Sequence, residues 1–280
     1  MSEEAVPLVV VCSFRNLAIR YLGLDIPREW EPLVGARVAK RLQHLNLPLR
    51  RYLCRLYEEG GVEEIIGFWQ LVRPRPAQFF DRWLDYLQLY SYVERKLAQG
   101  ERRFRFWSVG CGSGEEAYAM EIITHQVAEL HGIHPERLDL NILVTDVSNG
   151  ALEAGQRGVY ERSQVEQVPA ALRRRYFYRS CGGVAIAEAM RTHLSYRCLN
   201  LARTPLPLTG PFDAIFCYEG LAPLVSEARA RIIPAMQELL AEDGVFCAGF
   251  AREAHSSADG IAKGGGQARV PVAPRAPGDC

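Results

Sequence analysis

The feature that most constrains the fold is an alternation of strand-like and helix-like segments that begins near residue 104. Short apolar segments with the length of strands lie at 104–109, 138–146, 195–199, 212–217 and 244–249. Segments with helical character lie between several of them, at 115–130, 150–157 and 226–241. Strands that alternate with helices form βαβ units and a mostly parallel sheet. The sequence therefore predicts an α/β domain over residues 104–256.

The first 92 residues predict a different, entirely helical domain. Apolar residues recur at helical spacing, and prolines interrupt the pattern, in the segments 14–24, 33–45, 49–57, 62–72 and 79–92. The charged segment 93–103 predicts a helix end and a linker to the α/β domain. Residues 257–280 are rich in glycine and proline and nearly lack aromatic and branched apolar side chains, so we expect a disordered tail.

Charge and cysteine content argue against several classes of protein. Lys+Arg and Asp+Glu both number 33, whereas a general nucleic-acid binder needs an excess of positive charge. No apolar run approaches the roughly 20 residues that cross a bilayer, and the N-terminus lacks the basic start of a secretory signal. The 8 cysteines form no C-x-x-C pair and the histidines do not cluster, so we expect neither a zinc site nor a disulfide framework. Free thiols are typical of the cytoplasm, where we expect the protein to act.

The strongest local motif is a strand that leads into a helix through Gly110, Gly112 and Gly114. Glycine permits a tight turn and the close approach of a ligand, and the helix N-terminus offers unpaired N–H groups. Dinucleotide sites place a pyrophosphate there, but Glu115 and Glu116 follow at once and would repel it. S-adenosylmethionine (SAM) carries a sulfonium, an ammonium and a ribose diol without phosphate, so the motif favours SAM. The alternative is that both glutamates are ordinary first-turn residues favoured by the helix dipole.

Asp146 ends the second predicted strand, where the C-terminal ends of parallel strands form a crevice. A carboxylate at this place can accept hydrogen bonds from the two hydroxyl groups of a ribose. The alternative is an acidic residue in an ordinary strand-end turn. Strand, glycine loop, helix, strand and acid, in this order, predict a nucleoside-binding half-domain.

Further motifs follow in order along the chain: Trp107–Ala119, Val144–Val147, Gly158–Tyr160, Leu172–Phe177, Asn200-Leu201 and Gly210–Cys217. With this run of motifs the sequence resembles the chemotaxis receptor glutamate O-methyltransferase (CheR) family over residues 14–250. Members are SAM-dependent enzymes that methyl-esterify glutamates on the cytoplasmic helices of receptors. The resemblance implies a Rossmann-like SAM-dependent methyltransferase sheet after a small helical domain, and chemoreceptor cytoplasmic domains as partners. It also implies a small antiparallel insert near residues 178–199, and we expect a monomer.

The resemblance implies a set of cofactor-binding residues: Gly110, Gly112, Gly114, Glu116, Asp146, Asn200, Leu201, Cys217 and Tyr218. Within this set, Glu116 would contact the methionine or adenosine end of SAM, and Asp146 would hold the ribose. Asn200 and Leu201 would lie beside the adenine. Cys217 and Tyr218 would line the floor of the pocket.

Arg37, Lys40 and Arg41 form a basic stripe on one side of a predicted helix. The resemblance implies that this stripe binds the substrate, because it would face the acidic receptor helices. A solvated helix face is the alternative, and it is the commoner place for basic residues.

Three departures from the family pattern concern the chemistry. Pro223 stands where the family has a tyrosine beside the transferring methyl group, and proline offers neither a polar side chain nor an N–H. Asp81 stands where the family has an arginine that helps to hold the SAM carboxylate, although Arg82 follows directly. The glycine- and proline-rich tail replaces a hairpin after the fifth strand. The catalytic residue is therefore unidentified, and two functions stay open: a glutamate methyltransferase, or a catalytically impaired homologue that binds receptors or signalling partners.

Overall fold

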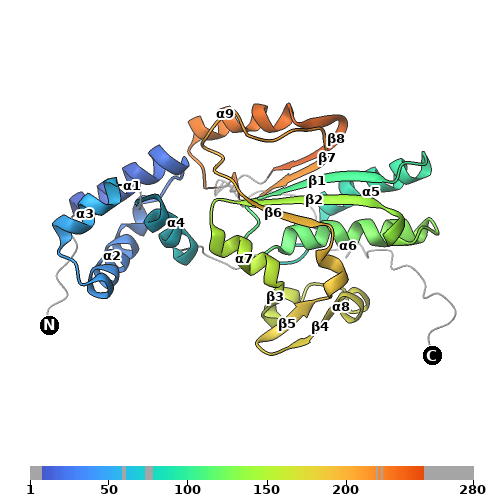
Figure 1. Cartoon of the computed structure of the whole chain (residues 1–280), viewed down its shortest axis with the longest axis horizontal. Helices are drawn as coiled ribbons and strands as arrows, with labels where there is room; N and C mark the ends of the chain where they lie inside the picture. Colours follow the sequence, from blue (N-terminus) through green and yellow to red (C-terminus); the bar gives the residue numbers. More distant parts are fainter. Residues whose placement is uncertain (1–7, 59–60, 73–77, 219, 222, 249–280) are drawn as a thin grey trace, which may run out of the picture.

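The computed structural model describes residues 8–58, 61–72, 78–218, 220–221 and 223–248, and its centre is a five-stranded parallel sheet (Figure 1). The strands are β1 (Arg103–Val109), β2 (Asp139–Asp146), β6 (Leu194–Cys198), β7 (Phe212–Cys217) and β8 (Leu240–Ala248). They lie in the order β6-β2-β1-β7-β8, and every pairing is parallel. The chain moves outward from β1 to β6 and returns to the other side of β1, which places a topological switch point there. The predicted α/β, Rossmann-like fold is confirmed.

Alternate side chains of β1 enter two separate cores, one on each face of the sheet. Phe104 and Phe106 pack with α5 (Trp83–Ala98) and α6 (Glu115–Leu130). Trp107 packs in the other core with side chains of α1 (Leu8–Leu22) and α9 (Ser226–Gln237). Figure 1 shows α9 and α6 on opposite sides of the strands. A strand that is buried on both faces needs apolar residues on both sides, which is why its sequence is nearly continuous in apolar residues.

The N-terminal region is a group of four helices: α1, α2 (Glu31–Leu45), α3 (Leu49–Tyr57) and α4 (Gly61–Val72). They pack through their apolar faces, and the Phe14 and Phe68 rings meet edge to face with their centroids 4.8 Å apart. The helical character predicted for residues 14–72 agrees with these helices. In Figure 1 they lie beside the α/β sheet at one end of the molecule.

The boundary predicted between the helical domain and its linker lies inside α5. The segment 93–103 consists of the end of α5, a turn and the start of β1. Val93 and Leu97 are buried in the sheet core, whereas Arg95 on the outer face forms an ion pair with Asp243 of β8 at 2.7 Å. The many charged residues on the outer face of this helix suggested a linker, although its other face is buried. Helix α5 packs against the sheet and is not a linker.

The predicted insert is a three-stranded antiparallel sheet in the order β3-β5-β4. Its strands are β3 (Val159–Tyr160), β4 (Phe177–Ser180) and β5 (Gly183–Ile186), and α7 (Asn149–Arg157) and α8 (Ala170–Tyr176) precede β3 and β4. The insert begins earlier than residue 178 and ends at β5, because residues 194–198 pair with β2 in the main sheet. Short 3-10 helices are η1 (Arg28–Trp30), η2 (Pro135–Arg137), η3 (Arg162–Val165) and η4 (Glu188–Arg191).

The last described strand, β8, begins before the predicted strand 244–249 and pairs with β7 across a register shift between Phe212 and Ala214. The disordered tail predicted for 257–280 lies outside the described residues. Within the described part of the chain, no helix has the length and apolar character needed to span a membrane.

Candidate functional site

A cavity of about 240 Å³ lies at the C-terminal ends of β1 and β2. The glycine loop between β1 and α6, the start of α7, the segment after β6, and helices α1 and α4 all contribute to its lining. The principal lining residues are Leu22, Leu24, Ile66, Trp69, Gly110, Gly112, Asp146, Ser148, Asn200, Leu201 and Pro223. The cavity therefore lies between the N-terminal helices and the edge of the sheet where parallel α/β folds bind ligands.

The glycine loop is fastened to the end of β2 by backbone hydrogen bonds. The N–H groups of Gly110 and Cys111 donate to the Thr145 carbonyl at 2.8 and 3.1 Å. The Gly112 N–H donates to the Asp146 carboxylate at 3.4 Å. Gly110 and Gly112 have φ angles of 74° and 55°, a region that residues with side chains rarely adopt. Glycine is therefore required for this loop to lie against β2 and the cavity.

Asp146 holds its carboxylate at the cavity wall. The Ser148 N–H donates to this carboxylate at 2.9 Å. The Ser148 hydroxyl in turn accepts from the Ala151 N–H at 3.3 Å and caps α7. A carboxylate has about four lone-pair sites, so ribose hydroxyl groups can donate to Asp146 in addition to these backbone groups. The position suits the predicted contact with a ribose diol.

Main-chain hydrogen bonds join the N-terminal helices to the sheet domain beside the cavity. The Asp25 N–H donates to the Pro223 carbonyl at 2.8 Å, and the Val225 N–H donates to the Gly23 carbonyl at 2.8 Å. These bonds form a short antiparallel bridge between the segments that follow α1 and β7. The bridge positions the end of α1 over the cavity and makes the helical region part of the site.

The sequence patterns missed one wall of the cavity, which is apolar. Leu22, Leu24, Ile66 and Trp69 line it, and the Trp69 ring lies 5.8 Å from that of Trp30. Apolar residues at helical spacing indicate only that one helix face is buried. No signal in the sequence distinguishes a face that covers a ligand from a face that packs on another helix.

Five of the predicted cofactor-binding residues line the cavity: Gly110, Gly112, Asp146, Asn200 and Leu201. The Asn200 side chain is already engaged with the protein. Its Nδ2 donates to the Tyr21 carbonyl at 2.9 Å, and its Oδ1 accepts from the Ala202 N–H at 2.9 Å. Asn200 therefore fixes α1 beside the cavity, and it also lines the cavity itself.

The other four predicted cofactor-binding residues do not line the cavity. Gly114 is the N-cap of α6, and Glu116 accepts a hydrogen bond from the Ser108 hydroxyl at 2.6 Å. Cys217 is fully buried, and burial raises the pKa of its thiol. Tyr218 is half-buried after the end of β7, and burial raises the pKa of its hydroxyl as well.

A cation lies beside Tyr218 at the end of β7. The Arg82 guanidinium is 4.5 Å from the centroid of the Tyr218 ring, a cation–π geometry that favours this position. Asp81 is exposed. Arg82 therefore keeps a cation beside Tyr218 at the end of β7, next to the position where the family has an arginine.

The predicted basic stripe is divided by an ion pair. Arg41 contacts Glu64 of α4 through two nitrogens, with Nη2–Oε1 at 2.7 Å and Nε–Oε2 at 3.0 Å. The Glu64 side chain is only 8% exposed, so Arg41 compensates a nearly buried charge. Lys40 is exposed and Arg37 is half-buried. Arg41 thus joins α2 to α4, and only Arg37 and Lys40 are left for a partner.

The cavity has the chemical character that SAM requires. Its apolar wall suits an adenine, the Asp146 carboxylate suits a ribose diol, and the glycine loop allows close contact with the backbone. Among the described residues that line it, none is basic. A phosphate-bearing cofactor would need positive charge or free helix N–H groups here, whereas a nucleoside without phosphate does not.

Gly114→Ala is expected to destabilise the junction between the glycine loop and α6. Gly114 has a φ of 92°, and an added Cβ would lie 3.1 Å from the Tyr118 ring and 3.2 Å from the Gly155 Cα. The left-handed backbone and the crowding together should cost about 2–4 kcal/mol in the free energy of unfolding, measured by denaturant titration. Gly132→Ala is the control, since its φ is 68° and no atom lies within 4 Å of the added Cβ; it should cost about 1–2 kcal/mol. Equal losses would contradict the role of crowding.

Comparison with known proteins identifies the family. The model of the CheR methyltransferase SAM-binding domain matches residues 77–263. "Chemotaxis protein methyltransferase 2" of Pseudomonas aeruginosa is 29% identical over 240 residues, which cover 84% of this chain and 83% of that protein. "Chemotaxis protein methyltransferase" of Salmonella typhimurium is 27% identical over 239 residues, which cover 84% and 80%. Since the family match covers more than half of the chain, the protein belongs to the CheR family of SAM-dependent methyltransferases.

Proposed function

We propose that the protein methylates glutamate side chains on the cytoplasmic helices of chemoreceptors, and that it acts as a cytoplasmic monomer. The observation that carries the proposal is the cavity in which the glycine loop meets Asp146 beside α1 and α4. The names of the relatives support a chemotaxis substrate, because they are called chemotaxis protein methyltransferases and align over most of their length.

The main task of the chain in this reaction is to bind and align the reactants. Asp146 would hold the ribose, the apolar side chains of α1 and α4 would cover the adenine, and Arg82 would pair with the methionine carboxylate. Bound SAM supplies an electrophilic methyl group, which a substrate carboxylate takes up as an ester while the electrons of the carbon–sulfur bond return to sulfur. A glutamate has an ordinary pKa of about 4.3 and is ionised at neutral pH. The chain therefore needs no general base, and alignment is its principal contribution.

Pro223 supports a second candidate function, a catalytically impaired homologue that binds receptors. Pro223 lines the cavity, and its carbonyl accepts the hydrogen bond from Asp25. Its side chain has no hydroxyl that could lie beside a transferring methyl group. The backbone of Pro223 thus still binds the helical region, whereas the tyrosine hydroxyl that the family has at this position is missing.

A methyl-transfer assay distinguishes the two candidates. The purified full chain would be incubated with methyl-tritiated SAM and a receptor cytoplasmic fragment, and base-labile radioactivity would be released as methanol. Ester formation that disappears when the fragment's methylation-site glutamates are replaced by alanine supports the methyltransferase. A folded protein that binds the fragment without forming ester supports the impaired homologue. Pro223→Tyr, which keeps the carbonyl and adds a hydroxyl, should then restore transfer.

Arg37 and Lys40, the part of the basic stripe left for a partner, are expected to increase the affinity for the substrate. Arg37→Ala with Lys40→Ala should raise KM for the receptor fragment by about 3- to 10-fold at low salt, because rim charges contribute modestly and are screened by ions. The kcat should stay within twofold. The control is Arg229→Ala with Arg231→Ala, which removes the same charge from α9. An equal effect of both pairs would mean that only net charge matters, and the proposed contact would be wrong.

A further inference from the structure

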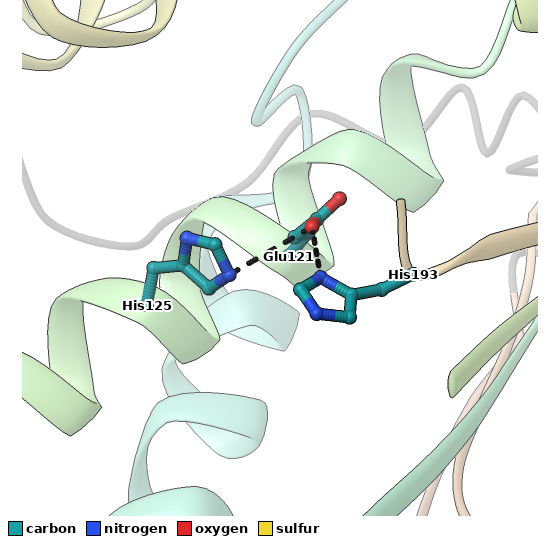
Figure 2. Close-up of side chains that lie close together, drawn as sticks. All are labelled: Glu121, His125 and His193. Atoms are coloured by element: carbon teal, nitrogen blue, oxygen red, sulfur yellow. Dashed lines mark hydrogen bonds and ion pairs between the residues drawn. The ribbon is translucent and has the colours of Figure 1, made fainter. Parts of the chain in front are cut away.

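Three side chains that the methyltransferase site does not use converge beside α6 (Figure 2). Glu121 and His125 lie one turn apart on α6, and His193 comes from the segment just before β6. Glu121 Oε1 is 2.7 Å from His193 Nδ1 and 3.7 Å from His125 Nε2. The three ligand-type atoms all lie within 4.8 Å of one another. None of the three residues lines the cavity.

The cluster is buried, and its polar groups are incompletely satisfied. Glu121 is fully buried and His125 is 7% exposed. In the described part of the chain, Glu121 Oε2 and His125 Nε2 have no hydrogen-bond partner. Each buried polar group without a partner costs about 1–3 kcal/mol. Two such atoms in one cluster could be satisfied by a bound ion.

The charges around the cluster are compatible with a bound cation. The neighbouring cation, Arg175, is paired with Glu129, which reduces its repulsion of a positive ion. His193 keeps 22% of its side chain exposed and provides an entry path from solvent.

We propose that Glu121, His125 and His193 form a binding site for a divalent transition-metal ion, with Zn²⁺ as the best match. Two imidazole nitrogens and one carboxylate are a common ligand set of zinc sites that keep a fourth position for water. Zinc bonds of about 2.0–2.1 Å in a tetrahedron place neighbouring ligand atoms about 3.3 Å apart. The 3.7 Å separation is near that value, whereas the 2.7 Å separation is a hydrogen bond between His193 and Glu121 that the ion would replace.

The bound ion would join the start of β6 to α6. The sequence patterns predicted no zinc site, because the histidines do not cluster along the chain. Glu121 and His125 at i and i+4 were the only local signal, and His193 reaches them through the packing of β6 beside β2. By mass action, an ion that binds only the folded chain raises its stability.

Zinc binding by the full chain tests the proposal directly. Protein stripped with a chelator would be titrated with Zn²⁺ in competition with a chromophoric chelator, and Tm would be measured with and without Zn²⁺. The wild type should bind one equivalent tightly and gain Tm. His125→Gln and His193→Gln should each weaken this binding by more than about 100-fold, since even outer partners of metal ligands contribute 10- to 100-fold. His134→Gln, an exposed histidine, is the control and should bind as the wild type does.

Cobalt provides a readout that does not depend on the variants. A site with two nitrogens and one oxygen should give tetrahedral Co²⁺ bands in the visible without a sulfur charge-transfer band in the near ultraviolet. The spectrum of the wild type therefore distinguishes Co²⁺ bound at the cluster from Co²⁺ bound to the free thiols of the chain. The test holds even if a variant fails to fold. Absence of stoichiometric binding by the folded wild type, equal binding by the glutamine variants, or a thiolate spectrum would each overturn the proposal.

Discussion

Asp146→Ala is expected to weaken the binding of S-adenosylhomocysteine by at least about 100-fold, measured by calorimetry. The carboxylate lines the cavity and would accept hydrogen bonds from both ribose hydroxyl groups. Hydrogen bonds to a charged group contribute about 1.5–3 kcal/mol each, so loss of two of them exceeds the 2.7 kcal/mol that corresponds to about 100-fold. The demethylated product is the better ligand because it cannot react during the titration.

The variant also removes two hydrogen bonds that organise the loop, and a control must separate these effects. The Asp146 carboxylate accepts from Gly112 and Ser148. Ser148→Ala leaves the carboxylate in place and removes only the hydroxyl that caps α7, so it should cost about 1 kcal/mol of stability and leave affinity within about threefold. If a folded Asp146→Ala protein bound the product within threefold of the wild type, the ribose would lie elsewhere.

Arg82→Ala is expected to weaken product binding by about 10- to 100-fold and to lower methyl transfer at subsaturating SAM by a similar factor. Arg82 lies over the Tyr218 ring at the end of β7, and we expect it to replace the arginine that the family has one residue earlier. A charge-assisted contact with the methionine carboxylate accounts for an effect of this size. At saturating SAM the rate should recover, because the lost contact is to the cofactor and not to the transition state alone.

Two matched variants test whether charge or ring stacking is responsible. Arg82→Lys keeps a cation at this place and should recover most of the affinity. Arg95→Ala removes another α5 arginine that lies over a tyrosine, Tyr92, at 5.2 Å. Arg95 lies near the other end of α5 and pairs with Asp243 of β8, so product affinity should not change. A loss with Arg95→Ala equal to that with Arg82→Ala would contradict a direct contact of Arg82 with the cofactor.

The strand, the glycine loop and the acid were predictable because each depends on neighbouring residues. A parallel strand buried on both faces requires a nearly continuous apolar run, as Phe104–Val109 has. A loop with positive φ requires glycine, as at Gly110 and Gly112. The helix begins directly after the loop, so the strand, the loop and the helix are consecutive in the sequence. An apolar run followed by glycines and the start of a helix can therefore be recognised in a single sequence.

The basic stripe and the linker were less well predicted because their environment comes from distant segments. Arg41 has the spacing of a surface residue, but Glu64 of another helix pairs with it. The charged residues around Arg95 suggested a linker, but Val93 and Leu97 are buried in the sheet core. Periodicity shows which residues share a face; it does not show what covers that face.

The sequence by itself determined the class of fold, the position of the glycine loop and the acid that ends β2. Only the tertiary structure decided that α1 and α4 line the cavity, that Arg82 lies over the Tyr218 ring, and that His193 meets Glu121 across 72 residues of chain. The physical reason is the range of the interactions. Backbone conformation and burial are governed by adjacent residues, whereas contacts between side chains depend on how whole helices and strands pack together.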